Sequence, residues 1–156
     1  MVLDNVIKIR RKIQINDAAI IDKCKALQSA VKDRDWFEVK TNADINGLME
    51  VAANFHDSYV KNMYVKDGKR YIRFDTTWGC EILFELDGNV DTNLFKDFGL
   101  VPIGDSYPII TDSSMFFENN LIFWVDDKTV KSCLDLDKSV FHYFCANTVK
   151  WKLIIQ

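Results

Sequence analysis

Three strand-like runs joined by tight turns, over residues 57–87, constrain the fold of this chain more than any other feature. Residues 59–66 and 69–75 flank Asp67-Gly68, and this pair favours a two-residue hairpin because both central positions need positive φ. Residues 80–86 then alternate between apolar and mostly polar side chains, which is typical of a strand with one buried face. The sequence therefore predicts a three-stranded antiparallel meander.

The N-terminal third carries helical patterns. Apolar residues recur at helical spacing over about 17–33, which predicts an amphipathic helix. A second helix is predicted behind a cap at Asn42 or Asp44, and it should end near Phe55. Apolar and polar residues alternate over 7–15, which indicates a half-buried strand, with a helix as the alternative.

Two further hairpins are predicted in the C-terminal half, each around a pair of turn-forming residues. They are 115–118 with 121–125 around Asn119-Asn120, and 140–146 with 149–155 around Asn147-Thr148. The stretch from Asn93 to Phe98 indicates a helical turn that Gly99 would stop.

Together these elements predict a single α+β domain spanning residues 1–156. In it, two N-terminal helices pack on one face of a mostly antiparallel, twisted sheet of six to eight strands. Hydrophobic residues make up 48% of the chain, which is enough to build a substantial core.

Charge and composition narrow the classes of partner. The net charge is −3, so the chain has no overall basic field to attract nucleic acid or an anionic membrane. No segment approaches the ~20 apolar residues of a membrane span, and the N-terminal order of charges does not fit a secretory signal. Cys24, Cys80, Cys133 and Cys145 are widely spaced, which favours reduced thiols and a cytoplasmic location.

The polar junction His56-Asp57-Ser58 contains the three residue types of a hydrolase triad. On a strand, however, neighbouring side chains point to opposite faces, so Asp57 could not join the other two. We therefore favour bonds from Asp57 or Ser58 to backbone groups where the helix ends, with a ligand or partner contact as the alternative. Trp78 lies in a predicted turn and is the aromatic residue most suspected of exposure and function.

Other constellations give little support to catalysis or metal binding. His142 is expected to be partly buried and hydrogen-bonded on the face shared by Val140 and Phe144. No pair of histidines or cysteines has the short spacing of a zinc site, and no glycine-rich phosphate loop is present. We expect no cofactor, no metal and no catalytic residue. Asp135 and Asp137 would share a face if extended, where they more often form a solvated strand edge than an acid–base pair.

The run Phe55-His56-Asp57-Ser58, with the following Tyr-Val-Lys-Asn-Met-Tyr, Ile72-Arg73-Phe74 and Cys80-Glu81-Ile82-Leu83-Phe84, resembles a group of small, poorly characterised bacterial proteins. In that group a short helix leads into a Phe-His-Asp-Ser or His-Asp element and then a β-meander. Some members are similar to immunity proteins of polymorphic toxin systems. The resemblance covers about a fifth of the chain; it implies binding of a cognate toxin and brings no catalytic residues with it.

Two hypotheses of function follow, with a third that the sequence cannot separate from the first. The first is a non-enzymatic protein-binding module, immunity-like, in which a sheet face or edge and acidic residues contact a basic protein; His56, Asp57 and Trp78 are candidate contacts. The second is a small hydrolase or ligand-binding enzyme centred on His56. The third is a homo-oligomer that uses the final strand as an edge. The acidic residues concerned are Glu85, Asp87, Asp91, Asp97, Asp105, Asp112, Glu118, Asp126, Asp127, Asp135 and Asp137.

Overall fold

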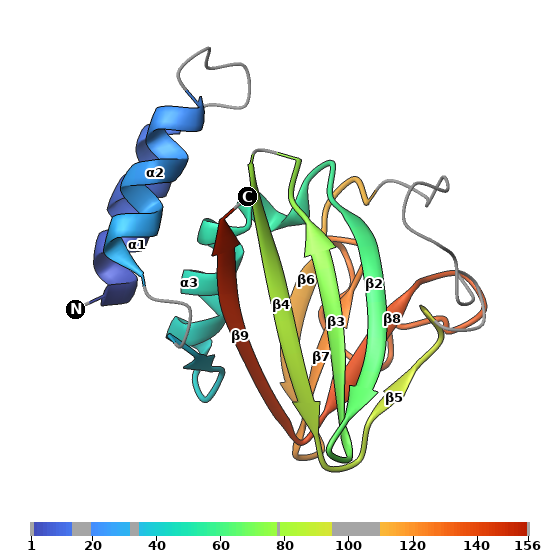
Figure 1. Ribbon diagram of the computed structural model, residues 1–156. Helices are drawn as coiled ribbons and strands as arrows, with labels where there is room; N and C mark the ends of the chain where they lie inside the picture. Colours follow the sequence, from blue (N-terminus) through green and yellow to red (C-terminus); the bar gives the residue numbers. More distant parts are fainter. Residues whose placement is uncertain (1, 14–19, 32–34, 78, 95–109, 156) are drawn as a thin grey trace.

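The computed structural model describes residues 2–13, 20–31, 35–77, 79–94 and 110–155. Within these ranges the chain forms three α-helices, one short 3₁₀ turn and nine strands (Figure 1). In chain order they are α1 (Val2–Lys12), α2 (Ile20–Ala30), β1 (Phe37–Glu38), α3 (Asn42–Val51), the 3₁₀ turn Ala53–Phe55, β2 (Tyr59–Lys66), β3 (Lys69–Asp75), β4 (Cys80–Asp87), β5 (Asp91–Thr92), β6 (Ser114–Glu118), β7 (Leu121–Val125), β8 (Tyr143–Ala146) and β9 (Thr148–Ile155).

The strands form two antiparallel sheets, in the orders β1-β9-β4-β3-β2 and β5-β8-β7-β6. Figure 1 shows the broad face of the five-stranded sheet toward the viewer, with the four-stranded sheet behind it. The α+β class and the antiparallel pairing are confirmed, and so is the meander, as β2-β3-β4. The prediction of one sheet of six to eight strands is corrected to two sheets that pack on each other.

Aromatic side chains join the two sheets. Phe74 and Phe84 on the inner face of the five-stranded sheet meet Trp124 and Phe144 of the four-stranded sheet, with ring centroids 5.0 Å apart for Phe74–Trp124 and for Phe84–Phe144. Phe55, at the end of the 3₁₀ turn, contacts rings of both sheets. All five side chains are fully buried, and this cluster forms the centre of the core.

A second apolar cluster lies on the other side of the four-stranded sheet. Residues 126–142, which connect β7 to β8, cover that side and contribute Val130, Leu136 and Phe141 to the cluster. As a result, four of the five residues of β7 are buried. Both faces of β7 are therefore buried.

The helices also differ from the prediction. Residues 2–12 form α1, so the strand predicted over 7–15 is wrong and its helical alternative is correct for the described part. The alternation of apolar and polar residues indicated a strand because Arg10, a charged residue, occupies a buried position of the helix. There its guanidinium donates to the carbonyls of Val51 and Ile13. These two carbonyls lie at and just beyond helix ends, where backbone groups lack intrahelical partners. The helix predicted over 17–33 is present as α2 over Ile20–Ala30, and residues 17–19 and 32–33 of that prediction lie outside the described residues.

The N-cap of helix α3 lies before both expected caps, one residue before Asn42 and three before Asp44. Thr41 is the N-cap and forms a capping box with Asp44, whose carboxylate accepts from the backbone N–H of Thr41. The helix ends at Val51 rather than near Phe55, because Ala53, Asn54 and Phe55 adopt φ of 52°, 53° and 57°. Three helices, rather than two, therefore share the inner core with the second sheet.

The two Asn- and Asp-based hairpins occur as predicted. Asp67 and Gly68 have φ of 51° and 77°, and Asn119 and Asn120 have φ of 54° and 61°, as a type I′ geometry requires. The β6–β7 pair is therefore confirmed together with the β2–β3 pair.

The third predicted hairpin, around Asn147-Thr148, is wrong. β8 pairs with β7 and β5, whereas β9 pairs with β4 and β1, so the chain passes from one sheet to the other at Asn147. The Asn147 side chain holds this crossing: its Oδ1 accepts from the N–H of Asn89 at 2.6 Å, and its Nδ2 donates to the carbonyl of Asn120 at 3.0 Å.

Replacing Asn147 should therefore weaken the connection between the sheets. We expect Asn147→Ala to lower the free energy of unfolding by about 1–2 kcal/mol, because two backbone groups lose their partner. Asn147→Asp is the matched control, since it keeps an acceptor for Asn89 and loses only the donor to Asn120. Urea unfolding curves would measure both, and equal losses for the two variants would contradict this account.

Candidate interaction face

The outer face of the five-stranded sheet is lined by charged residues and tyrosines. Ile82, Phe84 and Leu86 of β4 are buried in the core, so the alternating Glu81 and Glu85 point to the opposite, outer side. In Figure 1 this is the face of β9, β4, β3 and β2 seen from the front. The helices and the four-stranded sheet share the inner core, so among the described elements they leave this face to its own side chains.

Glu81 lies at the centre of the outer face and is fully buried. Its two carboxylate oxygens accept from Lys61 Nζ and from Arg73 Nε, which are on β2 and β3. A bulge between Val60 and Asn62 shifts the register at Lys61, which lets the side chain reach across β3 to Glu81. The two cations remain 24% and 32% exposed above the carboxylate they cover.

A second carboxylate that accepts hydrogen bonds from a neighbouring strand lies further along β4. Glu85 accepts from Lys69 Nζ at 3.2 Å and from the Tyr71 hydroxyl at 3.0 Å. Burial, and after it the bond to Glu85, raises the pKa of Tyr71 to about 12, so this hydroxyl stays a donor at neutral pH. The Tyr71 ring stacks on Tyr64 with centroids 5.0 Å apart, and Tyr64 is exposed.

Polar and charged side chains at the edges of the face also have partners. Asp75 is buried and accepts from the Tyr59 hydroxyl at 2.9 Å and from the N–H of Thr77 at 2.7 Å. On β9, Lys152 Nζ lies 5.0 Å from the centre of the Trp36 ring, a cation–π contact. Lys150 faces Glu85 in the β4–β9 register.

Counted over the five strands, the outer face holds six cations and five carboxylates. The charges lie at different depths, because Glu81 and Glu85 lie beneath while Lys61, Arg73 and Lys69, which bind them, reach toward solvent. At the centre of the face, Lys61 and Arg73 together carry more N–H donors than the single carboxylate of Glu81 can accept. Lys61 and Arg73 therefore keep donors that are directed toward solvent. Its cations are Lys61, Lys66, Lys69, Arg73, Lys150 and Lys152, and its carboxylates are Glu38, Asp75, Glu81, Glu85 and Asp87.

The acidic residues expected to meet a basic partner have mostly local roles. Asp127 accepts from the N–H and hydroxyl of Thr129, and Asp137 accepts likewise from Ser139. These bonds lower the pKa of both carboxyls, and they stabilise the turns of the 126–142 connection. Asp135 accepts from the N–H of Lys131, so it caps a turn rather than forming a strand edge with Asp137.

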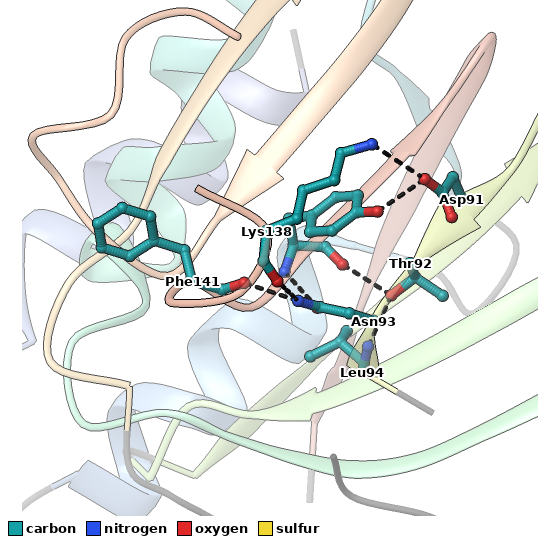
Figure 2. A network of polar contacts seen from close by, with 7 residues as sticks. Asp91, Thr92, Asn93, Leu94, Lys138 and Phe141 are labelled. Atoms are coloured by element: carbon teal, nitrogen blue, oxygen red, sulfur yellow. Dashed lines mark hydrogen bonds and ion pairs between the residues drawn. The ribbon is translucent and has the colours of Figure 1, made fainter. Parts of the chain in front are cut away.

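Asp91 belongs to a network that ties β5 to the end of the 126–142 connection (Figure 2). Its carboxylate accepts from the Tyr143 hydroxyl at 2.6 Å and pairs with Lys138, and these contacts lower its pKa. The side-chain amide of Asn93 donates to the carbonyls of Lys138 and Phe141, as Figure 2 shows. Neither β5 nor this network is indicated by the sequence, because its partners are about 50 residues apart.

The segment around His56 is a tight junction with positive φ at several positions. Asp57 has φ of 59°, and the three positive values of residues 53–55 precede it, with His56 at φ of −59° between them. The junction is bound to residues 110–113: the N–H of Asp57 donates to Ile110, and Ser113 donates to the carbonyl of Asn54. Left-handed residues of this kind cost energy, and the cross-links hold them in place.

His56, Asp57 and Ser58 do not form a catalytic relay. His56 is half-exposed and its Nδ1–H donates to the carbonyl of Thr111 at 2.5 Å; Nε2 lies 3.5 Å from the Asp57 carboxylate. Asp112 is the second carboxylate beside the ring, at 3.8 Å from Nδ1. The Ser58 hydroxyl is buried and has no hydrogen-bond partner in the described chain, so it forms no hydrogen bond with the imidazole.

The remaining predicted site residues lie elsewhere. Trp78, Asp97 and Asp105 lie outside the described residues. His142 is half-buried, and its Nδ1 lies 2.7 Å from the Asp126 carboxylate, which agrees with a hydrogen-bonded structural role; Val140 does not share its face on a strand, because β8 begins only at Tyr143. Within the described ranges, no three His, Cys, Asp or Glu side chains form a group able to hold a metal ion, and no helix is long and apolar enough to cross a membrane.

A cavity of about 290 Å³ lies beside the crossing from β8 to β9. It is bordered by the β6–β7 turn, by the Asn147 crossing and by residues 38–40. None of the predicted site residues lines it. Its walls combine strand and turn residues, with Glu38 and Lys40 as the charged groups.

The buried carboxylate of the outer face should be important for stability. We expect Glu81→Gln to lower the free energy of unfolding by about 1–3 kcal/mol, because Lys61 and Arg73 lose a charged acceptor while staying partly hydrated. Glu38→Gln is the control: this carboxylate pairs with the exposed Lys40, and the change should stay within about 0.5 kcal/mol. Urea unfolding at neutral pH and low salt tests both, and equal effects would contradict the burial argument.

The His56 junction should respond as a structural element. We expect His56→Ala and Asp57→Ala each to reduce stability by about 1 kcal/mol, through a lost backbone bond and through a left-handed alanine respectively. Asp57→Gly separates the two causes, because glycine accepts positive φ and should keep wild-type stability. Thermal melts measure all three. A fully stable His56→Ala, Asp57→Ala double variant that had lost binding or activity would overturn the structural interpretation.

Comparisons of this chain with protein-family models, with curated proteins and with solved structures find no significant match. The resemblance of residues 55–84 to immunity-like bacterial proteins therefore stays a prediction. The choice between the two candidate sites therefore depends on their geometry. The outer face of the five-stranded sheet is a broader candidate for a contact surface than the His56 junction.

Proposed function

We propose that this chain is a non-enzymatic protein-binding module whose contact surface is the outer face of the five-stranded sheet. One observation carries the proposal: cationic side chains are held above buried carboxylates, with exposed and half-exposed tyrosines between them. The side chains concerned come from four neighbouring strands, so the surface is broad and rigid.

The ion pairs of this face favour binding through pre-organisation. Lys61, Arg73 and Lys69 are already fixed by Glu81 and Glu85, so less side-chain entropy is lost when a partner docks. Tyrosine and arginine are the residue types that most often dominate the energy of protein interfaces. Tyr64, Tyr71 and Arg73 supply both types within one part of the face.

The charge arrangement supports a partner with an acidic surface. The carboxylates of Glu81 and Glu85 are occupied from above by Lys61, Arg73 and Lys69, whereas Lys61 and Arg73 retain donors directed to solvent. A basic partner, as the composition of residues 85–137 suggested, would meet these cations first. The proposal therefore places the complementary acidic groups on the partner.

A quantitative pull-down from source cells with the tagged chain tests this function. We expect one stoichiometric protein, with an acidic surface, whose capture weakens as salt rises. Tyr64→Ala, Lys66→Glu and Lys152→Gln, which lie across the face and leave the Glu81 pairs intact, should each reduce affinity about tenfold or more, or about 1.4 kcal/mol.

Lys128→Glu is the matched control, because Lys128 is equally charged and exposed but lies in the 126–142 connection. Its capture should equal that of the wild type. Loss of the partner in Lys128→Glu with retention in the face variants would contradict the proposed surface. Recovery of nucleic acid, or only of a second copy of the chain, would contradict the proposed partner.

A toxin is one partner of this kind, as the resemblance implies. If the captured protein inhibits growth, co-expression with the wild-type chain should restore growth, and co-expression with Lys66→Glu should restore it less. This comparison uses variants that fold, as circular dichroism would verify, so a loss of protection reports on binding.

A further inference from the structure

Two buried cysteines, distant in sequence, meet where helix α2 packs against the start of β4. Cys24 is on α2 and Cys80 is the first residue of β4, and their Sγ atoms are 4.0 Å apart. Cys80 is fully buried and Cys24 is 4% exposed. Gly79 makes this approach feasible, since a Cβ at that position would lie 2.7 Å from Cys24 Sγ.

We propose that Cys24 and Cys80 form a reversible disulfide that fastens the α1–α2 pair to the five-stranded sheet under oxidising conditions. The four cysteines, all within the described chain, hold no disulfide in this structure, so it represents the reduced form. The sulfurs are 4.0 Å apart and need to approach by about 2 Å to reach the bond length of about 2.05 Å.

The oxidant is a small disulfide such as oxidised glutathione. One cysteine thiolate attacks it, forming a mixed disulfide and releasing one glutathione thiolate. The second cysteine then attacks the mixed disulfide and releases the second glutathione. In total two protein thiols are oxidised, one glutathione disulfide is reduced to two thiols, and the two protons pass to the released glutathiones.

The surroundings of the Cys24–Cys80 pair make its oxidation slow. Burial, and after it the neighbouring Cys24, raises the pKa of the Cys80 thiol, so little thiolate is present while the helices are packed. Arg10, which is buried nearby on α1, acts in the opposite direction on Cys80. The reagent therefore reaches the pair when α1 and α2 separate transiently from the sheet.

The remaining cysteines offer an internal comparison. Cys133 is half-buried, and burial together with its contact to Glu118 raises its pKa to about 11. Cys145 is buried on β8. Both belong to the cluster on the far side of the four-stranded sheet, whereas the Cys24–Cys80 pair lies in the main core.

The test incubates the wild-type chain with a graded ratio of oxidised to reduced glutathione at pH 8. Mass spectrometry of the intact chain and of its peptides then identifies the product. We expect loss of two hydrogen atoms and a Cys24–Cys80 peptide link, reversed by excess reduced glutathione. The melting temperature should rise by on the order of 10 °C, because the link closes a loop of intermediate length in the unfolded chain.

Matched variants make the result specific. A Cys133→Ser, Cys145→Ser double variant should show the same product and the same rise in melting temperature, and Cys24→Ser should show neither. Oxidation should accelerate in low urea, which separates the helices from the sheet. A stable glutathione adduct without the internal link, a Cys133–Cys145 link, or a link that leaves the melting temperature unchanged would overturn the proposal.

Discussion

The structure depends above all on the contact between Phe74 and Phe84 of one sheet and Trp124 and Phe144 of the other. Phe74 and Phe84 occupy the inner face of the five-stranded sheet. The residues that alternate with them along β3 and β4 therefore have to point outward, whatever their charge. Glu81, Arg73 and Tyr71 are therefore on the outer face as a consequence of how the core is filled. The alternation of side chains that builds the core of the sandwich therefore also builds the surface proposed for binding.

Local patterns in the sequence were sufficient to predict the strands whose pairing partners lie close along the chain. Asp67-Gly68 and Asn119-Asn120 define hairpins because positive φ at these pairs is a local property, and the alternation of residues 80–86 is equally local. Asn147-Thr148 has a similar appearance but joins strands of different sheets. The choice between them is decided by the pairing of β9 with β4, some 60 residues earlier, which no local pattern contains.

The candidate site was predictable only in part, for a related reason. Alternation along β4 indicates that Glu81 and Glu85 lie on the side opposite the core, but it gives no measure of their burial. Full burial of Glu81 arises from Lys61, aimed by a bulge, and from Arg73 on another strand. The junction at His56 was expected to use side chains for backbone bonds, whereas the positive φ of Ala53 and Phe55 had no sequence signature.

The crossing at Asn147 has a consequence for how the chain assembles. β9 lies between β1 and β4 in the five-stranded sheet, so its residues 148–155 complete a sheet whose other strands precede residue 88. During synthesis, the long edge of β4 has its backbone groups unpaired until residues 148–155 emerge from the ribosome. An open edge of this kind is a template for incorrect pairing between chains. The sandwich is therefore expected to close late, after a period in which the β2-β3-β4 meander depends on chaperones or on its own charged outer face to avoid aggregation.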